Sequence, residues 1–382
     1  MDAFNNTTDF MREHSQVECL PTETLDLTVG SDADTFIELH AYTRSDAVIH
    51  IVLMPFILTV GLFGNLTILV AVAKIQWMRT ITNFYLVNLA MADITFLVVA
   101  IGEKLHQYSS TPFIYDDYPK GATGCILIPF IKDFCFFSSI FLVTCISMER
   151  FNAACRPLKQ RRDSGTKLRY RTAKLTIAAW VTSLAVSSLR ISASYQFQIY
   201  CLIWPDSYEE YPEIIGECRP PKEWISYATK CVQIVIFVLA MGINFLFYGK
   251  ITRAVNCSTA RPNARSIPSG ASVIEVRITR MVVATGVIFF LCLAPFELFS
   301  ALLMILTPTN GNFVSAMQVF RMMMYLNSAI NPLIYNVANP RYRKAFRLLF
   351  SCKGVTTACM PGRCHQSVTT SREKNFRETS NL

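Results

Sequence analysis

The sequence is poor in charged residues. Only 16% of its 382 residues are Asp, Glu, Lys or Arg, whereas 52% are hydrophobic. A soluble chain of this length carries about 25% charged residues and divides into two or so domains. The scarcity of charge therefore argues against a soluble protein and favours one embedded in a membrane.

Patterns of catalysis and metal binding are missing as well. No Gly-x-Ser-x-Gly, His-Glu-x-x-His or phosphate-loop sequence occurs, and the five histidines form no metal-ligand cluster. Residues 1–20 lack an apolar core, so a cleavable secretory signal is not predicted. The net charge of +9 is not gathered on a soluble basic face, which argues against a nucleic-acid partner. We therefore expect neither an enzyme nor a catalytic metal.

What is present instead is a series of long apolar stretches. We place seven of them at residues 47–74, 82–106, 122–153, 173–195, 224–253, 275–306 and 313–337. A membrane-spanning helix needs about 20 such residues, and each stretch is at least that long. The sequence thus predicts an all-α membrane protein in which residues 47–338 form a bundle of seven transmembrane helices. The first helix is expected to act as an uncleaved signal anchor.

The few charges are distributed unevenly. Residues 1–46 contain ten acidic residues against two basic ones, whereas the loop at 156–174 contains eight basic residues against one acid. Residues 339–382 contain nine basic residues against two acids. Short loops rich in Lys and Arg stay in the cytoplasm. We therefore expect a multi-pass protein of the plasma membrane, with an extracellular amino-terminal tail over 1–46 and a cytoplasmic tail over 352–382.

A short amphipathic helix is predicted over residues 339–351. Its apolar residues recur at helical spacing and the positions between them are basic: the apolar set is Tyr342, Phe346, Leu349 and Phe350, and the basic set is Arg341, Arg343, Lys344 and Arg347. Such a helix lies along an anionic inner leaflet, so membrane lipids are expected partners. Cys352, directly after it, is a predicted palmitoylation site.

Polar residues inside two apolar stretches are the most informative. Asp93 lies near the middle of the second stretch, where a carboxylate is costly and therefore faces the interior of the bundle. Pro332, after Asn331 in the seventh stretch, frees a backbone carbonyl that neighbouring helices or water must satisfy. Within seven spans, this combination indicates a conformational switch.

Further motifs recur at matching intervals along the spans. They are Gly64-Asn65, Asn88 to Asp93, Met148 to Phe151, Trp180, Tyr248, Phe289, Cys292 to Pro295 and Asn331 to Tyr335. Through these motifs, residues 47–351 resemble the rhodopsin-like (class A) G-protein-coupled receptors. The chain looks most similar to neuropeptide receptors of the thyrotropin-releasing-hormone, neuromedin-U and ghrelin type. The resemblance implies a receptor that activates a heterotrimeric G protein by outward movement of its sixth helix.

Two positions depart from the family pattern. Leu293 stands where the sixth span of the family has tryptophan, and Ala240 stands where the fifth span has proline. Both positions belong to the family's relay from ligand to cytoplasm. The substitutions therefore bear on basal activity, without indicating its direction.

The resemblance also implies an inner polar cavity that holds a sodium ion. Its expected lining is Asn65, Asp93, Ser139, Asn327 and Asn331. Hard oxygen ligands with one negative charge suit a small alkali cation. The alternative is a hydrated polar cluster that joins the helices without specific sodium binding.

At the cytoplasmic end, the family pattern assigns the G-protein coupling switch to Glu149, Arg150, Tyr248, Glu275 and Tyr335. In the inactive state Arg150 is expected to pair with Glu275, with Glu149 as a second partner. Tyr248 and Tyr335 would stabilise the open form through water-bridged hydrogen bonds. The alternative treats Glu275 as one solvated charge in a basic loop.

The predicted ligand-binding residues are Glu103, Lys132, Asp133, Glu297, Arg321 and Tyr325. Several ionisable groups at membrane depth imply mutual pairing or a polar ligand. Lys132 stands where amine receptors of the family have aspartate, and Tyr325 stands at the position of the retinal-binding lysine. Neither a monoamine nor retinal is therefore expected. Neutralisation of these charges by one another is the alternative.

The loop at 196–223 predicts a β-hairpin, because Phe197 and Ile199 alternate before a turn at Pro205 and an apolar strand begins at Ile214. The loop contains six acidic residues against two basic ones. Together with the acidic amino terminus, it would attract a cationic ligand and raise its association rate. An extracellular peptide ligand, a basic or amidated neuropeptide, is therefore favoured.

Two other functions remain open. Lys132 and Arg321 also suit a class A receptor for a lipid or a small acidic ligand. A membrane transporter is the alternative from another class, but the internal repeats and paired broken helices typical of transporters are missing from the sequence.

Covalent modification is expected on both sides of the membrane. We predict a disulfide between Cys125 and Cys218; Cys201 is the competing partner and Cys19 would take whichever cysteine is left. Asn5 and Asn6 begin overlapping glycosylation sequons. Phosphorylation of the Ser/Thr-rich cytoplasmic tail by a receptor kinase would recruit arrestin, although such tails also occur without that role.

Overall fold

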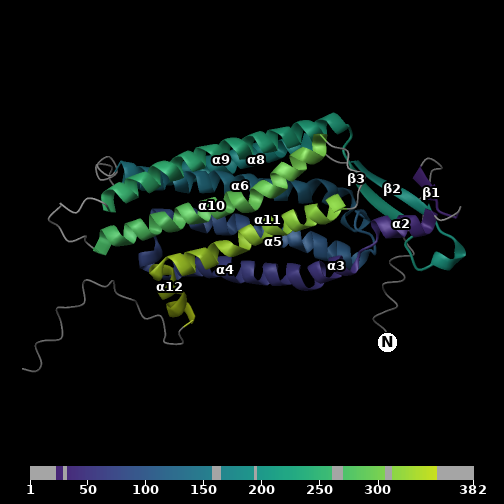
Figure 1. Cartoon of the computed structure of the whole chain (residues 1–382), viewed down its shortest axis with the longest axis horizontal. Helices are drawn as coiled ribbons and strands as arrows, with labels where there is room; N and C mark the ends of the chain where they lie inside the picture. The colour runs from purple at the N-terminus through teal and green to yellow at the C-terminus, as the bar shows by residue number, and fades with distance from the viewer. Residues whose placement is uncertain are drawn as a thin grey trace, which may run out of the picture.

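The computed structural model describes residues 23–28, 32–156, 165–192, 196–259, 270–305 and 312–350. Seven long helices lie side by side in this part of the chain (Figure 1). They are α4 (Met54–Lys74), α5 (Ile81–Ser110), α6 (Gly121–Cys155), α8 (Gly165–Ser192), α9 (Glu223–Thr259), α10 (Gly270–Ile305) and α11 (Asn312–Ala338). A shorter helix, α12 (Pro340–Phe350), lies at one end of the bundle.

The helices extend beyond several of the predicted spans. The first is continuous from Arg44 to Lys74, through α3 (Arg44–Val48), a π-helical turn η2 (Ile49–Leu53) and α4. The prediction of a loop up to residue 174 is wrong, because α8 already begins at Gly165. Lys and Arg are good helix formers, and the exposed side chains of this first turn reach water beyond the apolar span.

Six of the helices combine the length and hydropathy of a membrane span, counted over the described ranges. Helix α11 is not among them, because Gln318, Arg321, Asn327 and Asn331 lower its hydropathy. Its 27 residues are nevertheless enough to cross a bilayer, and it packs against α4, α5 and α10. The polar residues of α11 therefore belong to a helix inside the bundle.

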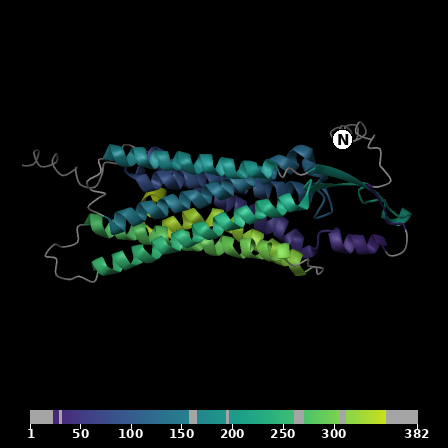
Figure 2. The same cartoon turned by 90° about the horizontal axis from the view of Figure 1, so that it is seen from above.

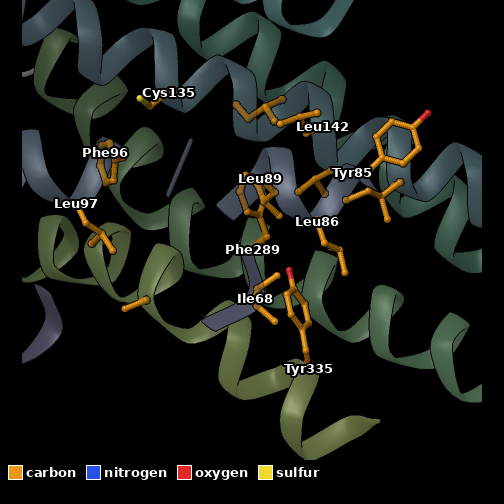
Figure 3. Close-up of a cluster of buried hydrophobic side chains, with 14 of the residues drawn as sticks. Ile68, Tyr85, Leu86, Leu89, Phe96, Leu97, Cys135, Leu142, Phe289 and Tyr335 are labelled. Atoms are coloured by element: carbon orange, nitrogen blue, oxygen red, sulfur yellow. The ribbon is translucent and has the colours of Figure 1, made fainter. Parts of the chain in front are cut away.

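Helices α4 and α11 approach closely because α4 presents glycines at the contact. A Cβ added at Gly61 would lie 3.1 Å from Ala329 Cβ, and one added at Gly64 would lie 3.0 Å from Pro332. Small residues at such contacts let helix backbones come together in membranes. Buried apolar side chains from the other helices, Leu89 and Phe289 among them, fill the space between the helices (Figure 3).

Local sequence fixes where individual helices begin. Thr80 caps α5, with its side-chain oxygen accepting a hydrogen bond from Asn83 N at 3.3 Å. Asn339 precedes α12, and its Oδ1 accepts from Arg341 N at 3.0 Å, while Pro340 occupies the first helical position. Such caps satisfy backbone amides that have no partner within the helix.

A small subdomain projects beyond the helix ends, at the end of the bundle away from α12 (Figures 1 and 2). We call it the hairpin cap; it consists of residues 23–28, 32–43, 111–118 and 196–219. Strands β2 (Gln196–Ile203) and β3 (Ile214–Arg219) form the predicted hairpin, with a 3-10 turn η5 (Asp206–Tyr208) between them. Strand β1 (Thr24–Asp26) pairs in parallel with β2, and α2 (Asp32–His40) lies beside the sheet. The hairpin is confirmed, whereas β1 and α2 are additions to the predicted fold.

Aromatic side chains form the core of the hairpin cap. Phe113, only 2% exposed, lies with its ring centroid 5.5 Å from Phe36 of α2, 5.7 Å from Tyr211 and 6.1 Å from Trp204. Tyr208 donates a hydrogen bond of 2.5 Å to Asp34. These contacts join the amino-terminal segment to the hairpin through a residue of the α5–α6 connection.

The predicted disulfide between Cys125 and Cys218 is confirmed, with their Cα atoms 5.6 Å apart. It fastens β3 to the first turns of α6. Asp116 reinforces this link, because its Oδ1 accepts from Gly216 N and Tyr118 N at 2.9 Å each. Cys201 is also disulfide-bonded, and Cys19 lies outside the described residues.

We expect Phe113→Ala to loosen the cap and leave the helix bundle intact. Removing a buried phenylalanine costs roughly 3–5 kcal/mol, and here the loss falls on a small local core. Hydrogen exchange followed by mass spectrometry should show faster exchange in peptides covering α2 and β1. Leu25→Ala, at a half-exposed position of the same sheet, serves as the control. Equal protection of α2 in Phe113→Ala and the parent would contradict this role.

Candidate ligand pocket and activation switch

At the cap end of the bundle, one carboxylate holds two ammonium groups. Glu103 of α5 lies with Oε1 2.7 Å from Lys120 Nζ and Oε2 2.6 Å from Lys132 Nζ, and its side chain is 5% exposed. Lys120 comes from the 3-10 turn η4 (Tyr118–Lys120), and it also contacts Asp117 Oδ1 at 2.6 Å. Glu103 is thus already paired with residues of the two segments that follow α5, η4 and α6.

The same region contains a surplus of positive charge. Lys104 Nζ donates to the neutral amide of Gln107, at 2.8 Å from Oε1. No described residue forms a salt bridge with Arg321 of α11. Four cations, Lys104, Lys120, Lys132 and Arg321, therefore face the two carboxylates of Glu103 and Asp117. This end of the bundle therefore has an excess of positive charge, where the sequence had indicated a mixture of charges.

Of the other predicted ligand residues, Glu297 and Asp133 have other surroundings, whereas Tyr325 lies close enough to Arg321 and Glu103 to interact with them electrostatically. Glu297 of α10 is 1% exposed and accepts a hydrogen bond from Gln233 Nε2 at 2.7 Å. Asp133 lines a largely apolar cleft of about 370 Å³ between α6, α8 and α9, together with Gln233 and Trp224. Tyr325 is buried, with its ring centroid 6.0 Å from that of Phe96. The six predicted residues are therefore divided among several parts of the bundle.

In the middle of the bundle, Asp93 and the break in α11 are connected. Asn331 Nδ2 donates to Asp93 Oδ2 at 2.8 Å. Pro332 cannot donate to the carbonyl of Ser328, and Asn65 Nδ2 donates to that carbonyl instead, at 3.0 Å. Two asparagines, one from α4 and one from α11, thus satisfy the freed carbonyl of Ser328 and one oxygen of the Asp93 carboxylate.

The inner polar residues also suit a small cation. All five of the predicted set are buried: Asn65, Asp93, Ser139, Asn327 and Asn331. Asp93 Oδ1 and Asn327 Oδ1 accept no hydrogen bond from the described residues. A carboxylate oxygen and an amide oxygen with spare lone pairs are the hard ligands that alkali and alkaline-earth cations prefer.

Near the α12 end, Arg150 is held by its neighbour and by α5. Its Nε and Nη2 donate to the Glu149 carboxylate at 2.5 and 2.7 Å, and Nη2 also donates to Thr82 Oγ1 at 2.7 Å. Both charged side chains are buried. Glu275 lies in α10, but its side chain lies outside the described residues. Among the described residues, Glu149 and Thr82 are the partners of Arg150.

The two tyrosines of the predicted switch have different surroundings. Tyr248 of α9 accepts a hydrogen bond from Ser147 Oγ at 3.0 Å and donates to Asn244 Oδ1 at 3.3 Å. Tyr335 of α11 is buried, and its hydroxyl has no hydrogen-bond partner among the described residues. Tyr248 therefore already bridges α9 and α6, whereas Tyr335 has a hydroxyl available for a new contact.

Sequence reasoning did not identify several polar residues of this network. Thr82 and Ser147 are hydroxyl residues with no distinctive spacing, so no signal singles them out. Asn244 could have been found, because an amide in the middle of an apolar span is rare and needs a partner. Its Nδ2 donates to Thr144 Oγ1 and to Ala240 O, both at 2.8 Å. Asn244 thus joins α9 to α6 at the turn where the family has proline.

Three further predicted sites lie outside the described residues. They are the glycosylation positions Asn5 and Asn6 and the palmitoylation position Cys352.

Comparison with known proteins agrees with this arrangement. The profile of the 7 transmembrane receptor (rhodopsin family) matches residues 64–335. The chain therefore belongs to the rhodopsin family of seven-transmembrane receptors and is a G-protein-coupled receptor of the membrane, not an enzyme. It is 27% identical over 337 residues to the thyrotropin-releasing hormone receptors of Bos taurus, Ovis aries and Homo sapiens. These matches cover 80% of this chain and 79% of each relative.

We expect Asp93→Asn to abolish the effect of sodium on the receptor. The substitution removes the only formal charge among the five inner residues, so a cation loses its strongest ligand. The melting temperature of the purified parent receptor should be higher in sodium chloride than in choline chloride. The control Asp26→Asn, which changes an exposed position, should show the same difference. A sodium effect of the same size in Asp93→Asn would show that these residues form a structural cluster only.

Thr82→Val should raise basal signalling. It removes the hydrogen bond that holds Arg150 to α5 while leaving Glu149 in place. A bias of about 1 kcal/mol shifts a two-state equilibrium about fivefold. Ligand-free nucleotide exchange on the G protein, at matched surface expression, measures this directly. Thr95→Val is the matched control, because Thr95 is on the same helix, is exposed and bonds only to its own helix, at Met91 O. Equal basal exchange in all three proteins would exclude a role for Thr82.

Proposed function

We propose that this receptor binds an extracellular peptide, and that the hairpin cap recruits the basic part of that peptide. The observation that carries the proposal is the charge of the cap. Its eight exposed carboxylates are Asp26, Asp32, Asp34, Glu38, Asp206, Glu209, Glu210 and Glu213. The described residues of the cap include a single Lys or Arg, Arg219, which is paired with Glu217 at 2.8 Å.

Local hydrogen bonds favour the ionised form of one cap carboxylate, that of Asp26. At Asp26, hydrogen bonds from the hydroxyl and the amide of Thr28, at 2.6 and 2.9 Å, lower the pKa of the carboxyl below its ordinary value. A surface of one sign raises the association rate of oppositely charged ligands, and salt screens this effect. A cationic peptide would therefore be concentrated at the cap before it enters the bundle.

The charged residues inside the bundle favour a different kind of ligand group from the one that the cap attracts. The expectation that Glu103 receives a basic group of the ligand is disfavoured by its two lysine partners. Lys132 and Arg321 instead suit the carbonyl groups of a peptide, including those of an amidated end. The proposed ligand is thus basic toward the cap and rich in hydrogen-bond acceptors toward the bundle. The relatives, which are named as receptors for a releasing hormone, agree with this class.

Ligand binding would activate a heterotrimeric G protein by moving α10 outward, as is general for the family. We propose that Arg150 then leaves Glu149 and Thr82, and that Tyr335 supplies a hydroxyl to the open form. A sodium ion beside Asp93 would favour the closed form. Helix α12 would lie on the inner leaflet of the plasma membrane, with the amino terminus outside. Arrestin binding to a tail phosphorylated by a receptor kinase belongs to the same proposal.

A second candidate ligand is a small acidic molecule or an acidic lipid. The surplus of positive charge around Lys104, Lys132 and Arg321 is the observation that favours it. The acidic cap would repel such a ligand, which is why the peptide is preferred.

The test is a screen of amidated peptides, basic and neutral, in cells expressing the receptor, with calcium and cyclic AMP as readouts and Arg150→Ala as the uncoupled control. We expect a basic amidated peptide to be active.

Replacing Glu209, Glu210 and Glu213 together by Gln should lower its potency about tenfold at low salt and less at high salt. Glu217→Gln, at a carboxylate already paired, should change little. Activation by small acids alone would contradict the peptide assignment.

A further inference from the structure

A narrow crevice opens between the first, second and seventh helices of the bundle. Its polar lining consists of Tyr42, His50, Lys104, Gln318 and Arg321, and the remaining lining is apolar. The crevice has a volume of about 20 Å³. A single water molecule needs roughly 10–15 Å³ on this measure, so the space suits one small ion or one end of a carboxylate.

The crevice combines two cations with no acid. None of the residues lining it is Asp or Glu. Lys104 is close enough to interact electrostatically both with Arg321 and with Glu103, whose two oxygens already bind Lys120 and Lys132. Like charges at membrane depth are costly unless enough opposite charge lies nearby. The one described hydrogen bond of the Lys104 ammonium goes to Gln107, a neutral amide.

The neighbouring carboxylates are already engaged. Glu103 binds Lys120 and Lys132 with its two oxygens. Asp46 caps α3, with Oδ2 accepting from Thr43 N at 2.8 Å and from Thr43 Oγ1 at 2.7 Å. Asp116 accepts from two backbone amides, and Asp117 binds Lys120. Cations therefore line the crevice, while the carboxylates near it are bonded to other groups.

Neutral donors complete the lining. Burial, with Asp46 and Asp116 nearby, raises the pKa of Tyr42, so its phenol stays protonated and able to donate. Gln107 is fixed with its oxygen toward Lys104, because its Nε2 donates to the carbonyls of Ile114 and Asp116 at 2.9 and 2.8 Å. Gln318 contributes an amide group to the lining. The crevice thus presents two charged donors and two neutral side chains that can donate.

We propose that this crevice is a binding site for a small anionic group, held between Lys104 and Arg321. The group is either a free inorganic anion such as chloride or the carboxylate of a ligand. By neutralising both cations, it would fasten the second helix to the seventh at the cap end of the bundle. The proposal does not depend on the peptide assignment, because it concerns a property of the receptor without its ligand.

The test is thermal unfolding of the purified full-length receptor at constant sodium concentration and ionic strength. Chloride is titrated against gluconate, which is too large for the crevice, and acetate serves as the carboxylate probe in a second titration. A ligand that binds only the folded state raises the melting temperature in a saturable way. We expect a shift of a few degrees in the parent and in the control Lys222→Gln, which changes an exposed lysine outside the crevice.

Lys104→Gln and Arg321→Gln should each lose most of the shift, whereas Arg321→Lys, which keeps the charge, should retain part of it. Saturation by chloride would identify a free anion as the occupant, and saturation by acetate alone would identify a carboxylate; both outcomes support the site. Equal melting curves in chloride, acetate and gluconate for the parent would overturn it. So would an undiminished shift in both Gln variants. Neither negative result would affect a peptide response in cells, so the two proposals fail separately.

Discussion

The free-energy cost of placing charge inside a membrane-spanning bundle constrains this molecule more than any other factor. At one end of the bundle, Glu103 lowers that cost by pairing with ammonium groups. A buried carboxylate without a partner is strongly unfavourable, as is a buried ammonium. Glu103 offers one oxygen to Lys120 and the other to Lys132, so three charges from α5, η4 and α6 stabilise one another. Lys104 and Arg321 form no salt bridge with a described carboxylate. The excess of positive charge at this end of the bundle, and the anion site proposed there, follow from this imbalance.

The same constraint explains how the two ends of the bundle are connected. Asp93 accepts a hydrogen bond from Asn331, whose neighbour Pro332 interrupts the hydrogen bonding of α11 and leaves a carbonyl for Asn65. Farther toward α12, Arg150 is buried because Glu149 and Thr82 surround its guanidinium. Each of these contacts either joins two helices or stabilises a buried charge that would be unfavourable in the apolar interior of the membrane. A shift of α11 relative to α4 and α5 would break the contacts of Asn331 and of the Ser328 carbonyl, so these polar groups would need new partners.

Much of this architecture could be predicted from the sequence. Long apolar runs indicate the helices, alternating Phe197 and Ile199 indicate the hairpin, and the positions of Cys125 and Cys218 indicate the disulfide. The hairpin cap could be predicted only in part, because β1 has three residues and α2 nine, and both depend on contacts with Phe113 and Trp204 rather than on their own propensities. The partners of Glu103 could not be predicted from the sequence either, because Lys120 lies in a three-residue turn whose orientation no periodic pattern encodes. Thr82 beside Arg150 is a contact over 68 residues of sequence and carries no local signal.

A double-mutant cycle on Glu103 and Lys132 tests the central role of Glu103 most directly. Thermal unfolding would be compared for the parent, Glu103→Gln, Lys132→Gln and the double variant. Glu103→Gln should be the more damaging single change, because it leaves Lys132 without a carboxylate partner and Lys120 with Asp117 alone, and adding Lys132→Gln should recover part of the loss. We expect a coupling free energy of more than about 1 kcal/mol, as is usual for paired groups in contact. Additive effects of the two substitutions would mean that Glu103 does not hold these charges together, and would contradict the charge balance from which the anion site was inferred.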